Sequence, residues 1–293
     1  MTTLRICTYN IHKGFSQFNR RLAIHDLRDR LRLLGADVVF LQEVQGMHLR
    51  HAQQHANWPG LPQHEFLARD MWHQTAYGGN AIYDHGHHGN AILTRFPIRQ
   101  WCNLDLSVNR LESRGVLHCD IKLPGWPCEV TALCIHLNLF GHDRRKQMEQ
   151  LSRYIERAVP RGNGLILAGD FNDWRRRANH EFADELGLQE VHEAVHGQHG
   201  KSFPARLPIL TLDRIYVRGL QIVGGGLAGA TILDDVERHL LAVRELAERR
   251  TLDGGDVHEH VARAALGLDE AVALGRVEPL DGTGGHARLY PCA

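Results

Sequence analysis

Long apolar runs are missing from this sequence of 293 residues, and so are cysteine pairs of the CxxC type. No segment is apolar over enough residues to cross a membrane, and the first residues, MTTLRICTYN, lack the apolar stretch of a signal peptide. Two of the six cysteines, Cys7 and Cys134, lie inside apolar runs, where a cysteine usually behaves as a small buried side chain. We therefore expect reduced thiols and a cytoplasmic protein.

An excess of one charge is missing as well. The chain has 34 Lys and Arg residues and 34 Asp and Glu residues. This balance excludes the overall basic field of many nucleic-acid-binding proteins, so a site for a polyanion must be a local patch. The charged fraction of 23% and the apolar fraction of 43% are those of an ordinary globular protein. At this length we expect one large domain, or one domain with an appendage.

Histidine, in contrast, is plentiful. Of the 21 histidines, eight lie between His48 and His88. A metal-binding tract is one interpretation of this segment. Because it has no regular ligand spacing beyond His-Gly-His-His at residues 85–88, we predict a solvated, histidine-rich loop instead.

Apolar periodicity predicts an irregular alternation of strands and helices. The expected strands cover residues 4–10, 36–44, 89–97, 115–123, 128–139, 164–172 and 212–226, and the expected helices cover residues 20–35 and 144–159. The strands at 115–123 and 128–139 are joined through PGWP and should form a hairpin. This mixture of hairpins and crossover helices predicts mixed β-sheets, not one parallel sheet.

Polar side chains recur where the predicted strands should leave the core. They are Asn10, Glu43, His136, Asn138, Asp170, Asn172 and Asp213. One Asp or Asn at a strand end is common in turns, but a set from separate strands indicates a converging site. Carboxylate and carboxamide oxygens suit Mg²⁺ or Mn²⁺ better than zinc. Such an ion, with carboxylates and a histidine, can activate water against a phosphorus ester.

Seven short motifs between residues 4 and 218 carry a resemblance to a known family. In chain order they are TYNIHKG, FLQEV, GNAILTRFP, ESRGVL, IHLNL with RRKQMEQL, LAGDFN and LDRIYV. Together they resemble the endonuclease/exonuclease/phosphatase superfamily, the fold of pancreatic deoxyribonuclease, abasic-site exonucleases, neutral sphingomyelinases and inositol-polyphosphate 5-phosphatases. The sequence closely resembles the small bacterial members of this superfamily. This resemblance implies an α/β fold, a four-layer sandwich in which two mixed β-sheets pack face to face with helices outside.

The resemblance also implies roles for the polar strand ends. Glu43 matches a metal-binding glutamate, and Asn10 an asparagine that positions metal or phosphate. Asp170 matches the aspartate that orients or deprotonates the attacking water. The other matches are Asn172 and His136 as phosphate ligands and Asp213 as the carboxylate that orients a late catalytic histidine. Because Asp170 and Asn172 are two residues apart, we expect both on the same side of their strand.

Three further residues are candidate substrate contacts. Asn138 follows His136 by two residues and is expected to bind phosphate. Arg114 either reaches the site or covers a strand edge. Arg175 begins the run Arg175–Arg177, which either contacts a substrate anion or forms a solvated face. If the substrate is nucleic acid, Arg144, Arg145, Lys146, Trp72 and Trp174 could also contact it.

The sequence departs from the family near its end, where members carry Ser-Asp-His before a short apolar strand. Our candidate for the histidine is His239, which follows Glu237 and Arg238; His286 is the alternative. Residues 233–246 also have helical apolar spacing, so this segment is either the strand or a helix. An arginine at a metal-binding position repels Mg²⁺, which puts activity in question.

These observations predict a domain over residues 1–249 and a helical appendage over 250–293, with an amphipathic run at 257–275. We predict a Mg²⁺- or Mn²⁺-dependent phosphoesterase that hydrolyses phosphodiesters and functions as a monomer. Its substrate would be nucleic acid or a phospholipid or small-molecule phosphodiester. The alternative is a catalytically impaired relative that binds phosphorylated ligands or a partner protein.

Overall fold

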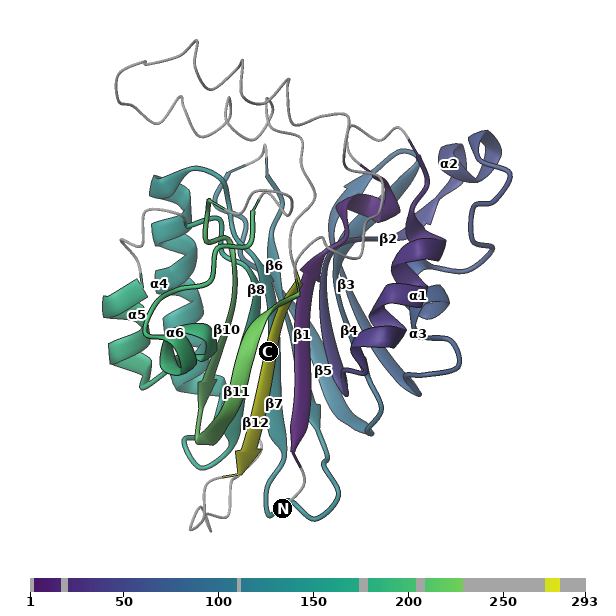
Figure 1. Ribbon diagram of the computed structural model, residues 1–293. Helices are drawn as coiled ribbons and strands as arrows, with labels where there is room; N and C mark the ends of the chain where they lie inside the picture. Colours follow the sequence, from purple (N-terminus) through teal and green to yellow (C-terminus); the bar gives the residue numbers. More distant parts are fainter. Residues whose placement is uncertain are drawn as a thin grey trace.

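In the computed structural model, two six-stranded β-sheets pack face to face with helices on their outer sides (Figure 1). The structure describes residues 3–16, 21–109, 112–173, 179–203, 209–228 and 272–279. The first sheet has the order β11 (Leu220–Ala228), β12 (Val272–Pro279), β1 (Leu4–Asn10), β2 (Val38–His48), β4 (Gly86–Thr94), β3 (Gln74–Tyr83). The second has the order β5 (Ile98–Asp105), β6 (Gly115–Ile121), β7 (Val130–His136), β8 (Gly164–Asp170), β10 (Asp213–Arg218), β9 (Gln189–Glu190).

Both sheets are mixed, as predicted. The pairs β1–β2 and β7–β8 are parallel, whereas the neighbouring pairs are antiparallel. Strands β6 and β7 form the hairpin expected across PGWP. The helical segments are a 3₁₀ turn η1 (His12–Gly14), α1 (Ile24–Leu34), α2 (Leu49–Gln54), α3 (Gln63–Ala68), α4 (Gly141–Ala158), α5 (Asn179–Leu186) and α6 (Val191–His196).

The helices cover the sheets through their apolar faces. Ile24 and Leu31 of α1 pack with Leu67 of α3 against the outer face of the first sheet. On the second sheet, Leu151 and Ile155 of α4 occupy the equivalent position. Full burial of one such side chain stabilises the fold by about 1.5–3 kcal/mol. Helix α1 ends at Gly35, whose φ of 60° is in the left-handed region that glycine adopts readily.

The central layer of the core lies between the two sheets. Ile6 and Phe40 from the first sheet share it with Cys134, Ala168 and Ile215 from the second. Because side chains alternate along a strand, the residue two positions after Cys134 or Ala168 also faces this layer. The four layers, helix–sheet–sheet–helix, confirm the predicted α/β sandwich.

The prediction of a helical appendage after residue 249 is wrong for Val272–Pro279. These residues form β12, which lies between β11 and β1 and is antiparallel to both. Thr8 pairs with Ala273, and Leu4 pairs with Val277. Pairing with the edge of β1 satisfies backbone groups of both strands, and this gain overrides the helical apolar spacing of residues 272–275. Residues 250–271 and 280–293 lie outside the described residues, and a boundary at 249 stays a prediction.

Two smaller expectations also need correction. Cys7, Cys119 and Cys134 are buried thiols, as expected, but Cys102 is disulfide-bonded. It lies half-buried on β5, an edge strand of the second sheet. The histidine-rich segment is not a loop, because it contributes to β2, α2, α3, β3 and β4. Within the described part of the chain, no helix is long and apolar enough to cross a lipid bilayer.

Candidate active site

Three predicted site residues form one row across the second sheet. His136 pairs with Asp170 between β7 and β8, and Asp170 pairs with Asp213 between β8 and β10. Residues in register on neighbouring strands point to the same face, here the face that carries Cys134, Ala168 and Ile215. The row therefore closes the central core at one edge of the sandwich. All three residues are at least 95% buried.

Gly169 allows β7 and β8 to approach closely at this point. Its φ is 152°, and a Cβ at this position would collide with the carbonyl oxygen of Ile135. Only glycine avoids both the collision and the unfavourable φ. The glycine of GDFN is therefore what lets Asp170 lie directly opposite His136.

A β-bulge redirects Glu43 of the first sheet. The register of β2 and β4 shifts between Leu41 and Val44, and Glu43 has a φ of 55°. Strict alternation would place Glu43 on the opposite face from Gln42, which faces the central layer. Bulges of this kind reorient side chains next to active sites. Here the bulge lets the Glu43 carboxylate reach Asn10 at the end of β1.

The Asn10 amide joins the two sheets at the site. Its Nδ2 donates to Glu43 Oε1 at 3.3 Å and to Asp170 Oδ2 at 3.2 Å, and its Oδ1 accepts from the His12 backbone N–H. Asn10 is fully buried, whereas the Glu43 side chain is 20% exposed. Two carboxylates from different sheets therefore share one amide group. Such a pair of hard oxygen donors is suited to a divalent cation.

Backbone strain is concentrated around these residues. Of the five non-glycine residues with positive φ among the described residues, four lie here: His12, Lys13, Glu43 and Asn172. Such conformations cost roughly 1–3 kcal/mol each and persist where the surrounding structure enforces them. Their clustering is typical of a functional site.

Asp170 is held by several groups at once. Its Oδ1 accepts from the Asn172 backbone N–H at 2.9 Å, and its Oδ2 lies 3.4 Å from His136 Nε2. Asn172 itself does not continue the strand, which ends at Asp170, so the alternation argument for it is wrong. A φ of 52° places Asn172 instead, and its Nδ2 donates to the Leu137 carbonyl at 2.7 Å.

The loop after His136 contains Asn138, and the Arg114 side chain contacts this loop. Arg114 Nε donates to the Leu137 carbonyl at 3.4 Å, so Arg114 lies at this loop and pairs with Glu112 at 3.7 Å. Asn138 is fully buried, and its Oδ1 accepts from Gln147 Nε2. The Asn138 Nδ2 makes no hydrogen bond within the part of the chain that the structure describes. A buried amide donor of this kind is available to a substrate oxygen.

A buried cluster of one aspartate and two arginines next to the site could not be predicted from the sequence. Asp173 lies between two buried arginines, 3.8 Å from Arg144 Nη2 and 3.7 Å from Arg214 Nη1. Arg144 is therefore not the surface contact that a nucleic-acid site would use. Trp72 is also wrong as a stacking residue, because it is buried and donates to the Ala36 carbonyl. His239, Arg175–Arg177, Trp174 and Arg238 lie outside the described residues.

A row of partly exposed rings, which we call the aromatic shelf, extends away from Glu43. Its members are His48, His51, Trp58, Tyr83 and His88. His48 and His51 are stacked with centroids 3.6 Å apart, and His51 lies 5.2 Å from Trp58. Tyr83 lies 5.7 Å from His48 and 5.8 Å from His88, which continues the row towards β4.

The shelf is uncharged at neutral pH and borders the site. Burial, together with nearby Lys13, lowers the pKa of His51 and of His88 to about 4. Burial also lowers the pKa of His48. Glu43 acts in the opposite direction on His88, which puts the inner end of the shelf near the Glu43 carboxylate. The spacing of the histidines in the sequence did not reveal this arrangement, because it depends on β2, α2 and the β3–β4 hairpin meeting in space.

Comparisons with known proteins identify the family of this chain. The model of the Endonuclease/Exonuclease/phosphatase family matches residues 7–230. The "Uncharacterized protein YbhP" of Escherichia coli K12 is 45% identical over 216 residues, which cover 74% of this chain and 85% of that protein.

Similar solved structures share the fold at low sequence identity. An endonuclease/exonuclease/phosphatase from Beutenbergia cavernae has a TM-score of 0.69 at 18% identity, covering 95% of this chain and 72% of that one. D. rerio TDP2 complexed with single-strand DNA product has a TM-score of 0.60 at 17% identity, covering 95% of this chain and 100% of that one.

Proposed function

The chain belongs to the endonuclease/exonuclease/phosphatase family, and we propose that it is a divalent-cation-dependent phosphodiesterase. One observation carries this proposal: the carboxylates of Glu43 and Asp170, from different sheets, meet at the Asn10 amide beside His136. Two buried or half-buried carboxylates that share one neutral donor would repel each other. A cation between them would offset this repulsion.

The donor set fits Mg²⁺ or Mn²⁺, because its oxygens are carboxylates and no thiol is present. We assign Glu43 as a ligand, since its side chain is partly exposed. Asn10 was expected to be a ligand as well. Because its Nδ2 faces both carboxylates and its Oδ1 accepts from His12, we assign it to holding the carboxylates in place. A bound cation would supply positive charge to the phosphate oxygens.

The chain's own residues would carry the proton transfer. Asp170 accepts a proton from water at Oδ2, while its Oδ1 stays fixed by the Asn172 N–H. The resulting hydroxide attacks phosphorus, and the bond from phosphorus to the leaving oxygen breaks. His136 and Asn138 Nδ2 donate hydrogen bonds to phosphate oxygens, and Arg114 contributes charge at the same loop.

The final proton goes to the leaving oxygen from a histidine oriented by Asp213. Asp213 is buried in the row beside Asp170, and its backbone N–H donates to Ser202 Oγ. We keep His239 as the proposed histidine and His286 as the alternative. Arg175 stays a proposed substrate contact. A cytoplasmic location and a monomeric state also stay predictions.

We propose nucleic acid as the substrate, because the aromatic shelf begins beside Glu43. Neutral imidazoles, Trp58 and Tyr83 offer flat faces on which bases can stack, at about 1–3 kcal/mol per base. Lys13 and Arg50 act electrostatically on the same histidines, so cationic groups for the phosphate backbone lie nearby. A lipid headgroup has no flat base to stack on these rings, and it is too short to extend along the whole shelf.

A substrate panel tests the proposal. Full-length protein would be assayed with Mg²⁺, Mn²⁺ or EDTA on single-stranded DNA, supercoiled DNA, RNA, bis-p-nitrophenyl phosphate and phospholipid vesicles. We expect metal-dependent cleavage of nucleic acid, with slower turnover of the small diester. Cleavage of phospholipid alone would reject the substrate assignment and keep the phosphodiesterase assignment.

The second candidate function is a catalytically impaired relative, and Arg238 favours it. A guanidinium at a metal-binding position would compete with the cation. This function predicts that the protein binds single-stranded DNA but cleaves no substrate of the panel with any metal. Arg238→Asp would then raise metal affinity and start hydrolysis, whereas in an active enzyme the same change would not raise the rate.

A further inference from the structure

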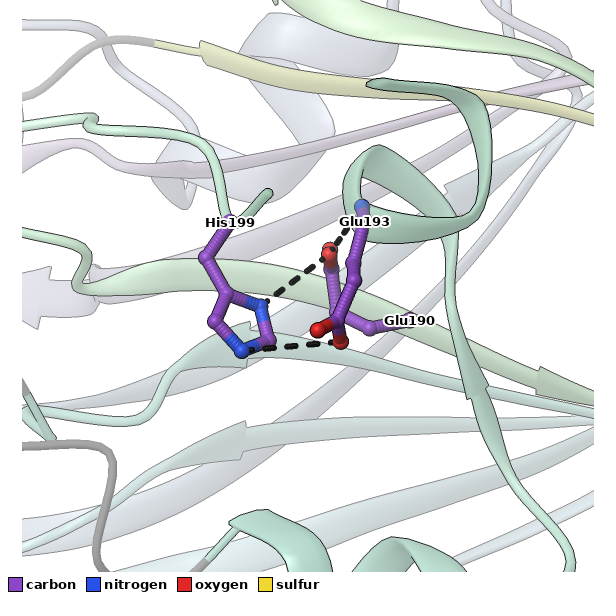
Figure 2. Close-up of side chains that lie close together, drawn as sticks. All are labelled: Glu190, Glu193 and His199. Atoms are coloured by element: carbon purple, nitrogen blue, oxygen red, sulfur yellow. Dashed lines mark hydrogen bonds and ion pairs between the residues drawn. The ribbon is translucent and has the colours of Figure 1, made fainter. Parts of the chain in front are cut away.

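Two glutamates and a histidine meet at a place that the proposed reaction does not use. Glu190 ends β9 and caps α6, Glu193 lies in the first turn of α6, and His199 follows the helix (Figure 2). Gly197 ends α6 with a φ of 69°, which turns the chain back so that His199 faces Glu190. The three residues come from one short stretch, E-V-H-E-A-V-H-G-Q-H.

The spacing of these side chains suits a single cation. His199 Nδ1 lies 3.4 Å from Glu190 Oε2, and His199 Nε2 lies 3.5 Å from Glu193 Oε2. One ligand atom from each residue can be chosen so that all three lie within 4.8 Å of one another. The contact between His199 Nδ1 and Glu190 Oε2 is a long hydrogen bond, because good N–H···O bonds measure about 2.7–3.2 Å. Two ligands that each bind a tetrahedral zinc at about 2.0–2.1 Å lie roughly 3.4 Å apart. Only one ring nitrogen of His199 can bind a given ion, so one of the two carboxylates is already at this separation and the other lies within the wider limit of 4.8 Å.

Burial and charge support the same interpretation. The Glu190 and His199 side chains are each 5% exposed, whereas Glu193 is 44% exposed. The open side at Glu193 gives an ion access and leaves room for water as a further ligand. Two carboxylates beside an imidazole carry net negative charge in a largely buried position, which a divalent cation would neutralise.

The Glu190 carboxylate is already held in the required orientation. Its Oε1 accepts from the His192 backbone N–H at 3.2 Å, and its Oε2 accepts from the Glu193 backbone N–H at 2.6 Å. Backbone donors of this kind fix a metal-binding carboxylate without using all of its lone pairs. The site therefore needs little rearrangement to bind an ion.

We propose that Glu190, Glu193 and His199 form a binding site for a zinc-class cation. One imidazole nitrogen with two carboxylates favours Zn²⁺ over Mg²⁺, which prefers oxygen ligands alone. The site is distinct from the catalytic carboxylates. Glu190 pairs with Tyr216, three residues along β10 from Asp213, which corresponds to about 10 Å along the strand.

The site would support Asp213 from a distance. Three residues after His199, Ser202 Oγ accepts from the backbone N–H groups of Leu212 and Asp213, at 3.2 and 3.0 Å. A cation bound by His199, Glu190 and Glu193 would hold His199 against β9 and α6. It would thereby fix the start of the segment that runs from His199 to Ser202. The ion is therefore a positioning element and takes no part in the reaction, so the inference does not depend on the proposed function.

Metal binding by the untagged full-length protein tests the site. Zn²⁺ would be titrated calorimetrically, and Co²⁺ would be used to detect tetrahedral absorption. Because other histidines can bind Zn²⁺, the variants decide. Glu193→Gln and His199→Gln should each weaken one Zn²⁺ site at least tenfold and abolish the Co²⁺ signal. Glu149→Gln, which changes an exposed glutamate on α4, should leave both unchanged.

Thermal unfolding gives a second readout. Zn²⁺ should raise the melting temperature of the wild type but not that of Glu193→Gln, whose partly exposed side chain makes misfolding a poor explanation. Wild-type Zn²⁺ affinity in both Glu193→Gln and His199→Gln would overturn the proposal, and so would a wild type without a Zn²⁺ site that these changes weaken.

Discussion

Asp170 is the residue at which the two sheets, the bulge and the GDFN loop meet. Its two oxygens are surrounded by Asn10, His136 and the Asn172 N–H, and its neighbour Glu43 shares the Asn10 amide. We expect the negative charge of the Asp170 carboxylate to matter more for activity than its shape, because an amide of the same size could make most of the same contacts.

Asp170→Asn should therefore abolish activity and preserve folding. The amide cannot accept the proton of water, and loss of such help typically costs roughly 10²–10⁴-fold in rate. Loss of one negative charge next to Glu43 should leave the melting temperature unchanged or raise it. Rates on single-stranded DNA and thermal unfolding of the same preparation would measure both effects.

Asp173→Asn is the matched control, three residues further along the chain. Asp173 pairs with two buried arginines, and removal of one partner from a buried ion pair typically destabilises a protein by about 3–5 kcal/mol. We expect a lower melting temperature for this variant. If Asp170→Asn kept more than about half of the wild-type rate, outside the range expected for a general base, the assigned role would be wrong.

Sequence patterns predicted part of this site at the residue scale. The steps from Cys134 to His136 and from Ala168 to Asp170 show that these polar side chains face the central core, because the period along a strand is two. The position of Glu43 could not be predicted in this way, because a bulge changes the face to which it points. The Asp173 ion pairs depend on long-range packing and leave no local signal.

At the scale of elements, β2, α2 and the β3–β4 hairpin together form the aromatic shelf. We expect Trp58→Ala and His51→Ala to raise KM for single-stranded DNA by about 5- to 150-fold, the equivalent of one lost stacking contact. The kcat for bis-p-nitrophenyl phosphate, which is too small to reach along the shelf, should not change.

Trp101→Ala is the control for the shelf. Trp101 is 52% exposed on β5, in the other sheet, so its removal should leave KM for DNA unchanged. Equal effects of Trp58→Ala and Trp101→Ala would show that the shelf does not bind the substrate.

Strand β12 leads to a prediction about truncation. Removal of residues 272–293 would expose the backbone edges of β1 and β11, and exposed edges favour aggregation. We expect this variant to be insoluble or to melt at a clearly lower temperature, whereas removal of residues 280–293 alone keeps the strand. Equal solubility and melting temperature of the two truncations would contradict a structural role for β12.

Elements with a strong local signal were the ones that could be predicted. Helix α1 has apolar residues at helical spacing and a glycine stop, and the β6–β7 hairpin has a turn between two apolar runs. Strand β12 has no such local signal. It forms by pairing with β1, whose residues are more than 260 positions away in the sequence. The prediction of a loop for the histidine-rich segment was wrong for a similar reason, since its rings pack together only where β2, α2 and the β3–β4 hairpin meet in space.

For the whole molecule, three half-buried histidines predict how stability depends on pH. Burial lowers the pKa of His51, His64 and His88 to about 4 in the folded protein, from an ordinary value of 6.5. Between these values the unfolded chain binds more protons than the folded one, so the free energy of unfolding should fall as pH falls from 6.5 towards 4. Above pH 6.5 the effect should fade, because the unfolded histidines also lose their protons there.

Urea unfolding at pH 7.5, 6.0 and 5.0 would measure this slope. His64→Gln should make it shallower, because glutamine does not titrate, while exposed His73→Gln should leave it unchanged. A slope that His64→Gln and His88→Gln leave intact would assign the pH dependence to other groups.

The dependence of the hydrolysis rate on Mn²⁺ tests the proposed function most directly, because the proposal rests on a cation held where the Glu43 and Asp170 carboxylates of the two sheets meet. Wild-type protein and Glu43→Gln would be titrated from EDTA to saturating Mn²⁺ on single-stranded DNA, with Glu149→Gln as the control. We predict no rate in EDTA, a saturable rise for the wild type and the control, and a much weaker apparent Mn²⁺ affinity for Glu43→Gln. Hydrolysis that proceeds equally well in EDTA, or a Glu43→Gln titration identical to that of the wild type, would contradict a metal-dependent site at Glu43.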